Sequence, residues 1–307
     1  VRIMTGAVVP DIYDAVIPVE DVTCDGQTVT ITRPVKPGQH IRLPGEDLSR
    51  GDRVLPKGTV VSRLAIGVIA SLGMEQLPVI RKPNVRIINT GDELVAPGQP
   101  LKAGQLYDAN GPTVQSLIAP FCGSLERRPR AADDLDRLTQ ELQADCDVII
   151  TTGGVSAGEK DFVPEAARRS GWQEVFHKVA IKPGKPVFCA VKDNQLLLGL
   201  PGNPLSTAVT CAVFVIPALK KMMGRSDFLP DLRDAELTGE PLKSNRTVIW
   251  PGKICGWDGH TTATIAAKRS SAALSALLDS DGLIFQHLCE TYQLPRVQVW
   301  PWPRILT

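Results

Sequence analysis

The chain has 307 residues, of which 43% are hydrophobic and 22% are charged, and its 34 Lys and Arg residues nearly balance its 33 Asp and Glu residues. This composition is typical of a folded globular protein and excludes wholesale disorder. A near-neutral chain has no general attraction for nucleic acid or for an anionic membrane surface. The apolar runs are shorter than a membrane span and no leader-like segment opens the chain, so we expect a cytoplasmic protein.

Seven cysteines and four histidines are scattered along the chain without a Cys-x-x-Cys pair, which argues against a zinc site or a disulfide framework. Apolar neighbours, as in "PVFCAV" and "TAVTCAVF", predict buried and reduced thiols. Metal binding through sulfur or imidazole is therefore not expected.

The first 83 residues divide into two predicted segments. Residues 1–45 consist of short β-type runs broken by turn formers and predict a β-rich domain remnant, because the chain opens inside an apolar run. Residues 46–83 predict part of a helical and linker domain, with a helix over 59–72 that ends at Gly73.

Residues 84–225 alternate between apolar strands and amphipathic helices, which predicts a parallel sheet covered by helices in three layers. Residues 226–307 return to β-type runs with Pro and Gly turns, typical of a small β-barrel. The predicted fold class is therefore multi-domain α/β: a central three-layer α/β domain flanked by β-rich and helical segments and by a C-terminal β-barrel domain.

The most informative motif, "TTGGVSAGEKD", follows the apolar strand "DVIITT". Its glycines allow close approach of the backbone to a ligand, and successive N–H groups at a strand-to-helix turn bind anions. A tight turn without a ligand is the structural alternative. The motif is not a Walker loop, because it lacks the Gly-Lys-Ser/Thr ending. The candidate ligand-binding residues in it are Thr152, Gly153, Gly154, Ser156, Gly158 and Asp161.

Two other strand ends carry comparable turns. In "NTGDEL", Asp92 and Glu93 could hold Mg²⁺ through their oxygens, although an ordinary helix N-cap explains the same pair. In "GLPGNPLS", Pro201, Gly202 and Asn203 lead into a long apolar helix that Asn203 could cap. Because ligands bind at the carboxyl edge of such sheets, we expect all three turns at one edge to form a site.

The segment "HKVAIKPGKPVF" supplies cations beside these turns. In a strand, Lys178 and Lys182 would share one face, and a Pro-Gly turn would bring Lys185 to join them. A solvated strand edge is the structural alternative. Three converging ammonium groups predict a polyphosphate or oxyanion ligand.

Several long motifs occur together and in order over residues 1 to about 224: "RIMTGAVVP", "GEDLSRGDRVLPKGT", "TTGGVSAGEKD", "VAIKPGKP" and "GLPGNPLS". The chain in this respect resembles the molybdopterin molybdenumtransferase family, that of MoeA and the gephyrin E domain. The resemblance implies insertion of molybdate into adenylylated molybdopterin, with Mg²⁺, to give molybdenum cofactor and AMP. It also implies a homodimer, and functional contact with the molybdopterin-adenylylating enzyme and with apo-molybdoenzymes.

The resemblance implies a role for each matching position. Thr5 and Asp47 correspond to positions that reach the site of a partner subunit. Asp92 and Glu93 correspond to the acidic metal site. Catalytic roles are implied for Glu93, Asp133, Asp161, Lys178 and Lys182. Ligand binding is implied for Thr5, Asp47, Thr152, Gly153, Gly154, Ser156, Gly158, Lys185, Pro201, Gly202, Asn203 and Ser271.

The chain departs from the family in two places. The family's N-terminal segment with its Ser-Ala-Met-Asp-Gly motif is absent, and Pro251 stands where relatives have an Arg in the "RTVIWPGK" strand. In "RSSAAL" we expect only Ser271 to contribute to the site. Two other functions fit the same fold. A scaffold protein could lose the lysines and acids that this chain retains, and a single-domain adenylylating enzyme would lack "IMTG" and "GEDLS".

Overall fold

The structure, a computed structural model, describes residues 1–131, 134–156, 162–256, 260–287 and 295–306. The chain divides into two compact units, Val1–Lys57 and Gly58–Thr307. The single boundary at Lys57 does not coincide with the predicted boundaries after residues 45, 83 and 225. The finer division into four domains stays a prediction.

The N-terminal unit has little regular structure. A short 3₁₀ turn, η1 (Val19–Asp21), precedes the antiparallel strands β1 (Val22–Cys24) and β2 (Val29–Ile31), in which Val22 pairs with Ile31. None of its residues is buried. A segment that buries so little apolar surface has only a small core of its own.

The second unit begins with a helix close to the predicted one. Helix α1 (Arg63–Ser71) starts at Ser62, whose hydroxyl oxygen accepts a hydrogen bond from the Ala65 amide at 3.1 Å. Gly73 follows the helix with φ of +72°, a backbone angle that favours glycine at a helix end. The predicted helix over residues 59–72 is thereby confirmed, with a later start.

The central sheet has the strand order β6-β3-β7-β11-β10-β8. Neighbouring strands β6, β3, β7 and β11 are parallel, whereas β10 is antiparallel to both of its neighbours. The sheet is therefore mixed, and the prediction of a parallel sheet is wrong at one edge. The six strands are β3 (Asn84–Thr90), β6 (Ser124–Ala131), β7 (Val148–Thr152), β8 (Gln173–His177), β10 (Phe188–Lys192) and β11 (Gln195–Leu200).

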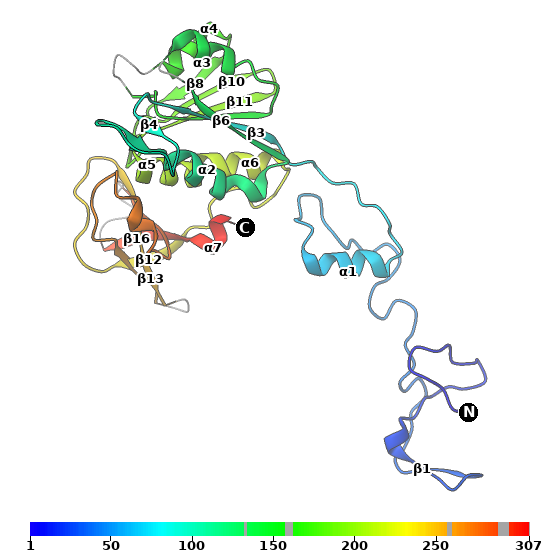
Figure 1. The fold of residues 1–307 in the computed structure, drawn as a ribbon. Helices are drawn as coiled ribbons and strands as arrows, with labels where there is room; N and C mark the ends of the chain where they lie inside the picture. Colours follow the sequence, from blue (N-terminus) through cyan, green and yellow to red (C-terminus); the bar gives the residue numbers. More distant parts are fainter. Residues whose placement is uncertain (132–133, 157–161, 257–259, 288–294, 307) are drawn as a thin grey trace. The chain divides into compact units, whose positions relative to one another are not determined.

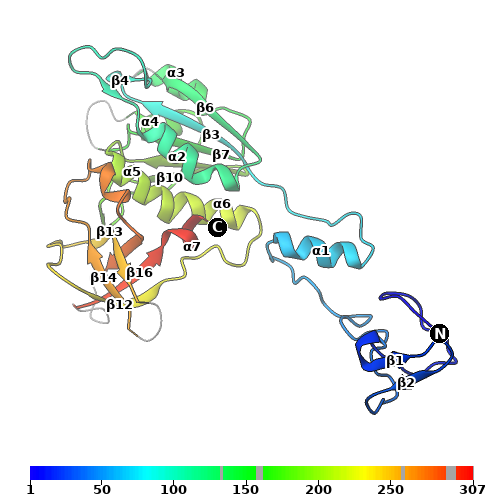
Figure 2. The ribbon, with the colours of Figure 1, turned by 60° about the horizontal axis from the view of Figure 1, so that its bottom comes forward.

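Helices cover both faces of this sheet, as predicted (Figures 1 and 2). Because side chains alternate along a strand, Ile87 and Ile150 face one core cluster while Ile88 and Ile149 face the other. The first face carries α2 (Asn110–Ile118), η2 (Ala119–Phe121), α5 (Pro204–Thr210), the π-helix η3 (Cys211–Val215) and α6 (Ile216–Met222). The second face carries α3 (Leu135–Glu141) and α4 (Val163–Arg169).

Elements α5, η3 and α6 form one continuous helix over Pro204–Met222. Among the described residues it is the one helix of sufficient length and apolar character to cross a membrane, with 19 residues, and 67% of its most apolar window is buried. Leu205, Val209 and Ile216 are fully buried in the core cluster that also contains the sheet residue Ile150. This apolar helix therefore packs in the protein core. It is longer than the uninterrupted apolar runs of the sequence suggested.

The C-terminal residues form a closed five-stranded barrel, which confirms the prediction. Strand β13 pairs with both β14 and β15, and β12 and β16 complete the ring. A sixth strand, β9 (Ile181–Lys182), joins its edge parallel to β13. The barrel strands are β12 (Arg233–Leu237), β13 (Thr247–Cys255), β14 (Thr262–Ile265), β15 (Gly282–Gln286) and β16 (Arg296–Pro301), with η4 (Leu274–Leu277) before β15 and α7 (Trp302–Leu306) after β16.

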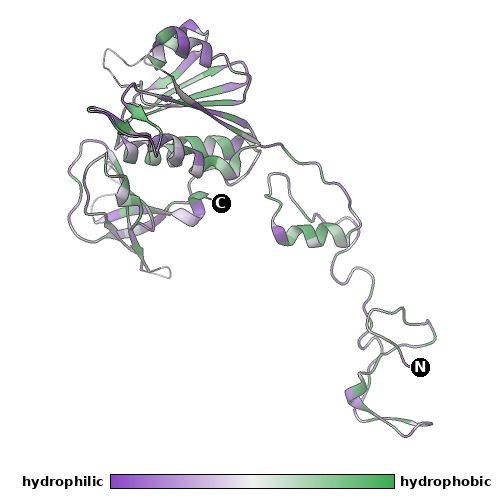
Figure 3. Cartoon of the chain, viewed as in Figure 1, coloured by the Kyte–Doolittle hydropathy of each residue, from purple (hydrophilic) through white to green (hydrophobic). Residues whose placement is uncertain are grey.

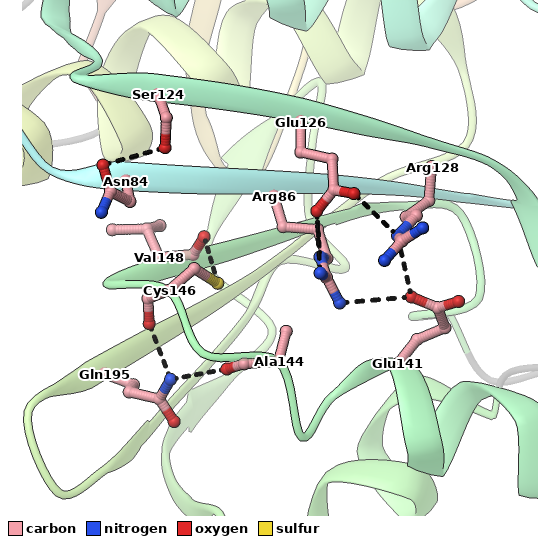
Figure 4. A network of polar contacts seen from close by, with 10 residues as sticks. All are labelled: Asn84, Arg86, Ser124, Glu126, Arg128, Glu141, Ala144, Cys146, Val148 and Gln195. Atoms are coloured by element: carbon pink, nitrogen blue, oxygen red, sulfur yellow. Dashed lines mark hydrogen bonds and ion pairs between the residues drawn. The ribbon is translucent and has the colours of Figure 1, made fainter.

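A network of charged side chains fastens α3 to the edge of the sheet (Figure 4). Arg86 of β3 lies 2.7 Å from Glu126 of β6 and 3.5 Å from Glu141 of α3. Arg128 of β6 contacts the same two carboxylates at 3.1 and 3.7 Å. Each charge faces an opposite charge, so these four residues are accounted for by the fold and do not form a candidate site.

A second ion pair connects the entry to β3 with the start of β7. The Arg81 guanidinium donates to both oxygens of Asp147 at 2.6 and 2.7 Å, and the Asn84 amide donates to the same carboxylate at 2.7 Å. These bonds hold the pKa of Asp147 below its usual range, and the bond from Arg81 has the largest effect.

Replacing Asp147 by Asn is expected to lower the free energy of unfolding at pH 7 by about 1 kcal/mol. Because the pKa is depressed in the folded state, the stabilisation is present above the unfolded pKa of roughly 3.9 and is lost as the pH falls through the folded value. Denaturant unfolding at pH 7 and at about pH 3 measures this difference, which should shrink at the lower pH. An equal difference at both pH values would contradict the assignment.

All cysteines of the described residues are free thiols. Cys189 and Cys211 are buried, as predicted, whereas Cys24 and Cys255 are exposed. Burial raises the pKa of Cys122 and of Cys189 to about 11. These two thiols are therefore protonated and unreactive at neutral pH.

Candidate functional site

Three glycine-bearing turns meet at one edge of the central sheet, as the sequence predicted. Strands β3, β7 and β11 are adjacent and parallel, and Thr152 at the end of β7 pairs with Asn89 on one side and Leu200 on the other. The turns that follow contain Gly91, Gly153 with Gly154, and Gly202. This carboxyl edge is where ligands bind in open α/β sheets.

A cleft of about 890 Å³ opens at this edge, a volume within the range of small-molecule sites. Residues of the turns, of β9 and the turn after it, and of the C-terminal barrel domain line the cleft. The cleft brings together these residues predicted from the sequence: Glu93, Thr152, Gly153, Gly154, Ser156, Lys182, Lys185, Pro201, Gly202, Asn203 and Ser271.

Other predicted site residues are not placed in the cleft. Lys178 and Asp92 do not line it. Thr5 and Asp47 belong to the N-terminal unit. The predicted roles of Asp133, Gly158 and Asp161 fall on residues outside those that the structure describes.

The turn after β7 depends on glycine for both its backbone angles and its space. Gly153 has φ of +87° and Gly154 has φ of +67°, angles that side chains disfavour. A Cβ at Gly153 would lie 2.8 Å from the Thr90 hydroxyl oxygen. The Gly153 amide donates to the Leu200 carbonyl at 2.9 Å, and the Thr90 hydroxyl donates to the Thr152 carbonyl at 3.1 Å. The turn is therefore fixed by both neighbouring strands.

Buried polar side chains support this turn from behind. The Thr152 hydroxyl donates to Asn89 Oδ1 at 3.0 Å, and Asn89 Nδ2 donates to Asp108 Oδ2 at 2.5 Å. Asp108 also accepts from the Gly111 amide at 2.9 Å and from Arg127 at 3.2 Å. Sequence reasoning missed Asp108, for which its place just before α2 in "YDAN" was the available signal. This series of hydrogen bonds connects β3, β7 and the start of α2.

The predicted arrangement of the three lysines is wrong in one respect. Lys178 follows β8 with φ of +72°, whereas Lys182 lies in β9, so the two do not share one strand face. Lys182 is half-buried in the cleft and its ammonium group donates to the Lys243 carbonyl at 3.3 Å. Lys185 also lines the cleft but is exposed. The cationic cluster therefore contains two of the three predicted lysines.

The barrel contributes cations that the sequence analysis did not identify. Arg246 and Arg269 line the cleft together with Trp250 and with Ser271, the one residue of this region that the family resemblance assigned to the site. Arg246 donates to the Ile181 carbonyl at 2.9 Å, beside Lys182. Of the charged residues described in the cleft, four are cations and only Glu93 is an acid, which favours an anionic ligand.

The third turn is fastened to the barrel and to α2 rather than capped internally. Asn203 occupies the N-cap position of α5, but its side chain makes no capping bond and donates instead to the Ser271 hydroxyl at 3.1 Å. The Asn110 amide group donates to the Gly202 carbonyl at 2.7 Å. The first bond joins the turn to Ser271 of the C-terminal barrel domain, and the second joins it to α2.

The acidic pair after β3 does not begin a helix, so the N-cap interpretation is wrong. The chain continues into β4 (Leu94–Val95), which pairs with β5 (Leu106–Tyr107). Within the described part of the chain no group of three His, Cys, Asp or Glu side chains could hold a metal ion. Glu93 alone does not fit Mg²⁺, which requires several oxygen ligands.

Strands β4 and β5 contribute apolar and aromatic side chains to the cleft. Leu94, Leu106 and Tyr107 line it, and the Tyr107 side chain is 48% exposed. The Tyr107 hydroxyl donates to the Gln99 carbonyl at 2.9 Å, which fixes the direction of the ring. The cleft therefore combines aromatic side chains with cations, a set of groups that suits a ligand with a planar ring and a phosphate.

Two sequence models of known families match the chain. The model described as "MoeA N-terminal region (domain I and II)" matches residues 1–73, and the model described as "Probable molybdopterin binding domain" matches residues 86–221. The second match contains the three turns of the cleft, which end by residue 204.

Two curated relatives are molybdopterin molybdenumtransferases by name. The molybdopterin molybdenumtransferase of Haemophilus influenzae is 40% identical over 233 residues, covering 74% of this chain and 57% of that protein. Molybdopterin molybdenumtransferase 2 of Mycobacterium tuberculosis is 38% identical over 245 residues, covering 77% of this chain and 60% of that protein. The chain thus spans less than two thirds of the length of these relatives.

A solved structure extends the likeness to the fold. The molybdopterin biosynthesis MoeA protein of Pyrococcus horikosii matches 94% of this chain and 72% of its own, with a TM-score of 0.75 and 29% sequence identity. The match therefore includes the barrel, which the two family models leave out.

Proposed function

We propose that this chain, which belongs to the MoeA family, is a molybdopterin molybdenumtransferase. In this proposal it inserts molybdate into adenylylated molybdopterin and releases molybdenum cofactor and AMP, in the cytoplasm. The observation that carries the proposal is the cleft at the three glycine turns, with four cations against one acid among its described residues.

The residues of the cleft support this chemistry through charge and position. Lys182 and Arg246 lie beside each other at β9, where they would neutralise a diphosphate and the divalent molybdate. When the phosphoanhydride bond breaks, AMP leaves with additional negative charge, which the same cations would stabilise. The backbone of Gly153 and Gly154 allows close approach of the pterin phosphate. Leu106 and Tyr107 would contact a planar ring.

Mg²⁺ dependence is part of the proposal from family resemblance alone. Glu93 provides one carboxylate in the cleft. A Mg²⁺ site would need further oxygen ligands, and Asp92, the second residue that the family resemblance assigns to the metal, does not line the cleft. No step of the mechanism above depends on the metal.

The proposal is tested by incubating the purified chain with adenylylated molybdopterin and measuring AMP release with and without molybdate. We expect release that requires molybdate and rises with its concentration. A second arm with tungstate asks whether the site distinguishes the two oxyanions. Absence of molybdate-dependent AMP release, with adenylylated molybdopterin still bound, would reject the enzymatic function.

That last outcome would favour the alternative, a non-catalytic molybdopterin-binding or scaffold protein of the same fold. The observation consistent with it is the incomplete metal site among the described residues. Retention of both cleft lysines argues against a scaffold that binds no anion, but it fits a non-catalytic protein that binds molybdopterin as well as it fits the enzyme. Binding of the molybdopterin-adenylylating enzyme or of apo-molybdoenzymes fits either function.

We also propose a homodimer. Helix α1 buries none of its residues, and Leu64 is 87% exposed while Ile66 is 58% exposed. Figure 3 shows α1 coloured as hydrophobic over most of its length. Apolar surface of this kind is normally covered by another polypeptide.

Sedimentation at micromolar concentration is therefore expected to give twice the mass of 33.1 kDa. Replacing Leu64 and Ile66 together by Gln should shift the equilibrium towards the monomer without changing the circular dichroism of the α/β domain. A strict monomer for the unmodified chain would contradict the dimer. It would also leave Thr5 and Asp47 without the partner site that the family resemblance implies.

A further inference from the structure

The glycine turn after β7 has a contact that no role in the cleft explains. The backbone carbonyl of Val155 accepts a hydrogen bond from Nε2 of His177 at 2.9 Å. A carbonyl oxygen can only accept, so Nε2 carries the hydrogen. Val155 lines the cleft and His177 does not, which places the imidazole behind the turn.

The sheet holds the imidazole in position. His177 is the last residue of β8 and pairs directly with Phe188 of β10. The two rings meet edge to face, with centroids 5.5 Å apart and planes at 86°. The Val155 side chain is buried in the same core cluster as Phe188. The donor therefore comes from rigid secondary structure, as a positioning group requires.

The direction of this bond determines what the turn presents to the cleft. The Val155–Ser156 peptide bond is trans, because the one cis bond found in the described chain is Lys182–Pro183. In a trans peptide the C=O and the following N–H point in opposite directions. A carbonyl directed at His177 thus directs the Ser156 N–H away from it, and Ser156 lines the cleft.

We infer that His177 is a positioning residue that orients the Val155–Ser156 peptide, so that its N–H rather than its carbonyl faces an anionic ligand. The inference rests on the proposed function only in taking the ligand of the cleft to be anionic. Without the imidazole donor, rotation of the peptide would bring a carbonyl oxygen toward the anion, where its partial charge is repulsive.

Two substitutions separate the donor from the ring. His177→Phe keeps the edge-to-face contact with Phe188 and removes the N–H, whereas His177→Gln keeps an N–H donor at similar reach and removes the ring. Isothermal titration with inorganic pyrophosphate measures the affinity of each chain. We expect His177→Phe to bind about tenfold more weakly, or about 1.4 kcal/mol, and His177→Gln to bind within twofold of the unmodified chain.

Melting temperatures of the same proteins report the role of the ring in packing. The melting temperature should fall further for His177→Gln than for His177→Phe. The inference is overturned if His177→Phe binds pyrophosphate normally, or if the affinity loss follows the ring and not the donor. Failure of the proposed function is a different result: pyrophosphate binding with the predicted His177 dependence, but no molybdate-dependent AMP release. An unmodified chain that binds no pyrophosphate would reject both.

Discussion

Replacing Lys182 by Gln is expected to weaken the binding of pyrophosphate and molybdate by about 10- to 100-fold, or about 1.4–2.8 kcal/mol. Lys182 is half-buried and lines the cleft beside Arg246, where solvent screens its charge less than on an open surface. Glutamine keeps a long polar side chain, so the melting temperature should change little. Isothermal titration at low ionic strength measures the loss of affinity. The difference between the two chains should narrow at higher salt, because salt screens the attraction between the Lys182 ammonium group and the anion.

Lys178 provides the matched control, because it belongs to the same segment and is exposed but does not line the cleft. Lys178→Gln should bind both anions like the unmodified chain and should release AMP at the same rate. Equal losses in the two variants would restore the predicted three-lysine cluster and contradict the geometry. Normal affinity in Lys182→Gln would remove the basis for an anion-binding cleft and strengthen the scaffold alternative.

The layered fold was predictable because its signals are local. A buried apolar strand that ends in a glycine turn identifies each of the parallel strands β3, β7 and β11 without knowledge of distant contacts. The prediction missed that β10 is antiparallel, because it extended the strand–helix alternation over a part of the chain that contains no helix. Residues 178–187 between β8 and β10 contain no helix, and a parallel connection would have needed one. Asp193, with φ of +50°, then turns β10 directly into β11.

Only the part of the cleft that the glycine turns form was predictable from the sequence. Its glycine turns lie at strand ends that the sequence identifies, but Arg246 and Arg269 come from the barrel, whose position depends on the pairing of Thr247 with Ile181. Such a pairing between residues far apart in the sequence leaves no local pattern. The error at Lys178 has a local cause, because φ of +72° is rare for lysine and ends the strand at His177, so that Lys178 and Lys182 do not share a strand.

Replacing Gly153 by Ala should damage both stability and ligand binding. The backbone angle φ of +87° costs a residue with a Cβ about 1–2 kcal/mol. The new Cβ would lie 2.8 Å from the Thr90 hydroxyl oxygen and 3.2 Å from the Thr90 carbonyl oxygen. Moving that hydroxyl breaks its bond to the Thr152 carbonyl, so the total loss in unfolding free energy should reach about 2–3 kcal/mol. Pyrophosphate affinity should fall at least tenfold, because the turn must shift.

Gly171→Ala separates strain from function. Gly171 has φ of +79°, nearly the same as Gly153, but a Cβ there would meet no atom within 4 Å. It lies after α4 and does not line the cleft. This variant should lose about the same 1–2 kcal/mol of backbone strain, measured by denaturant unfolding, while pyrophosphate affinity stays unchanged. If both alanine variants kept full affinity, the turn after β7 would not contact the anion. If both lost affinity in proportion to stability, the loss would reflect global unfolding, and the glycine turn would have no particular part in binding.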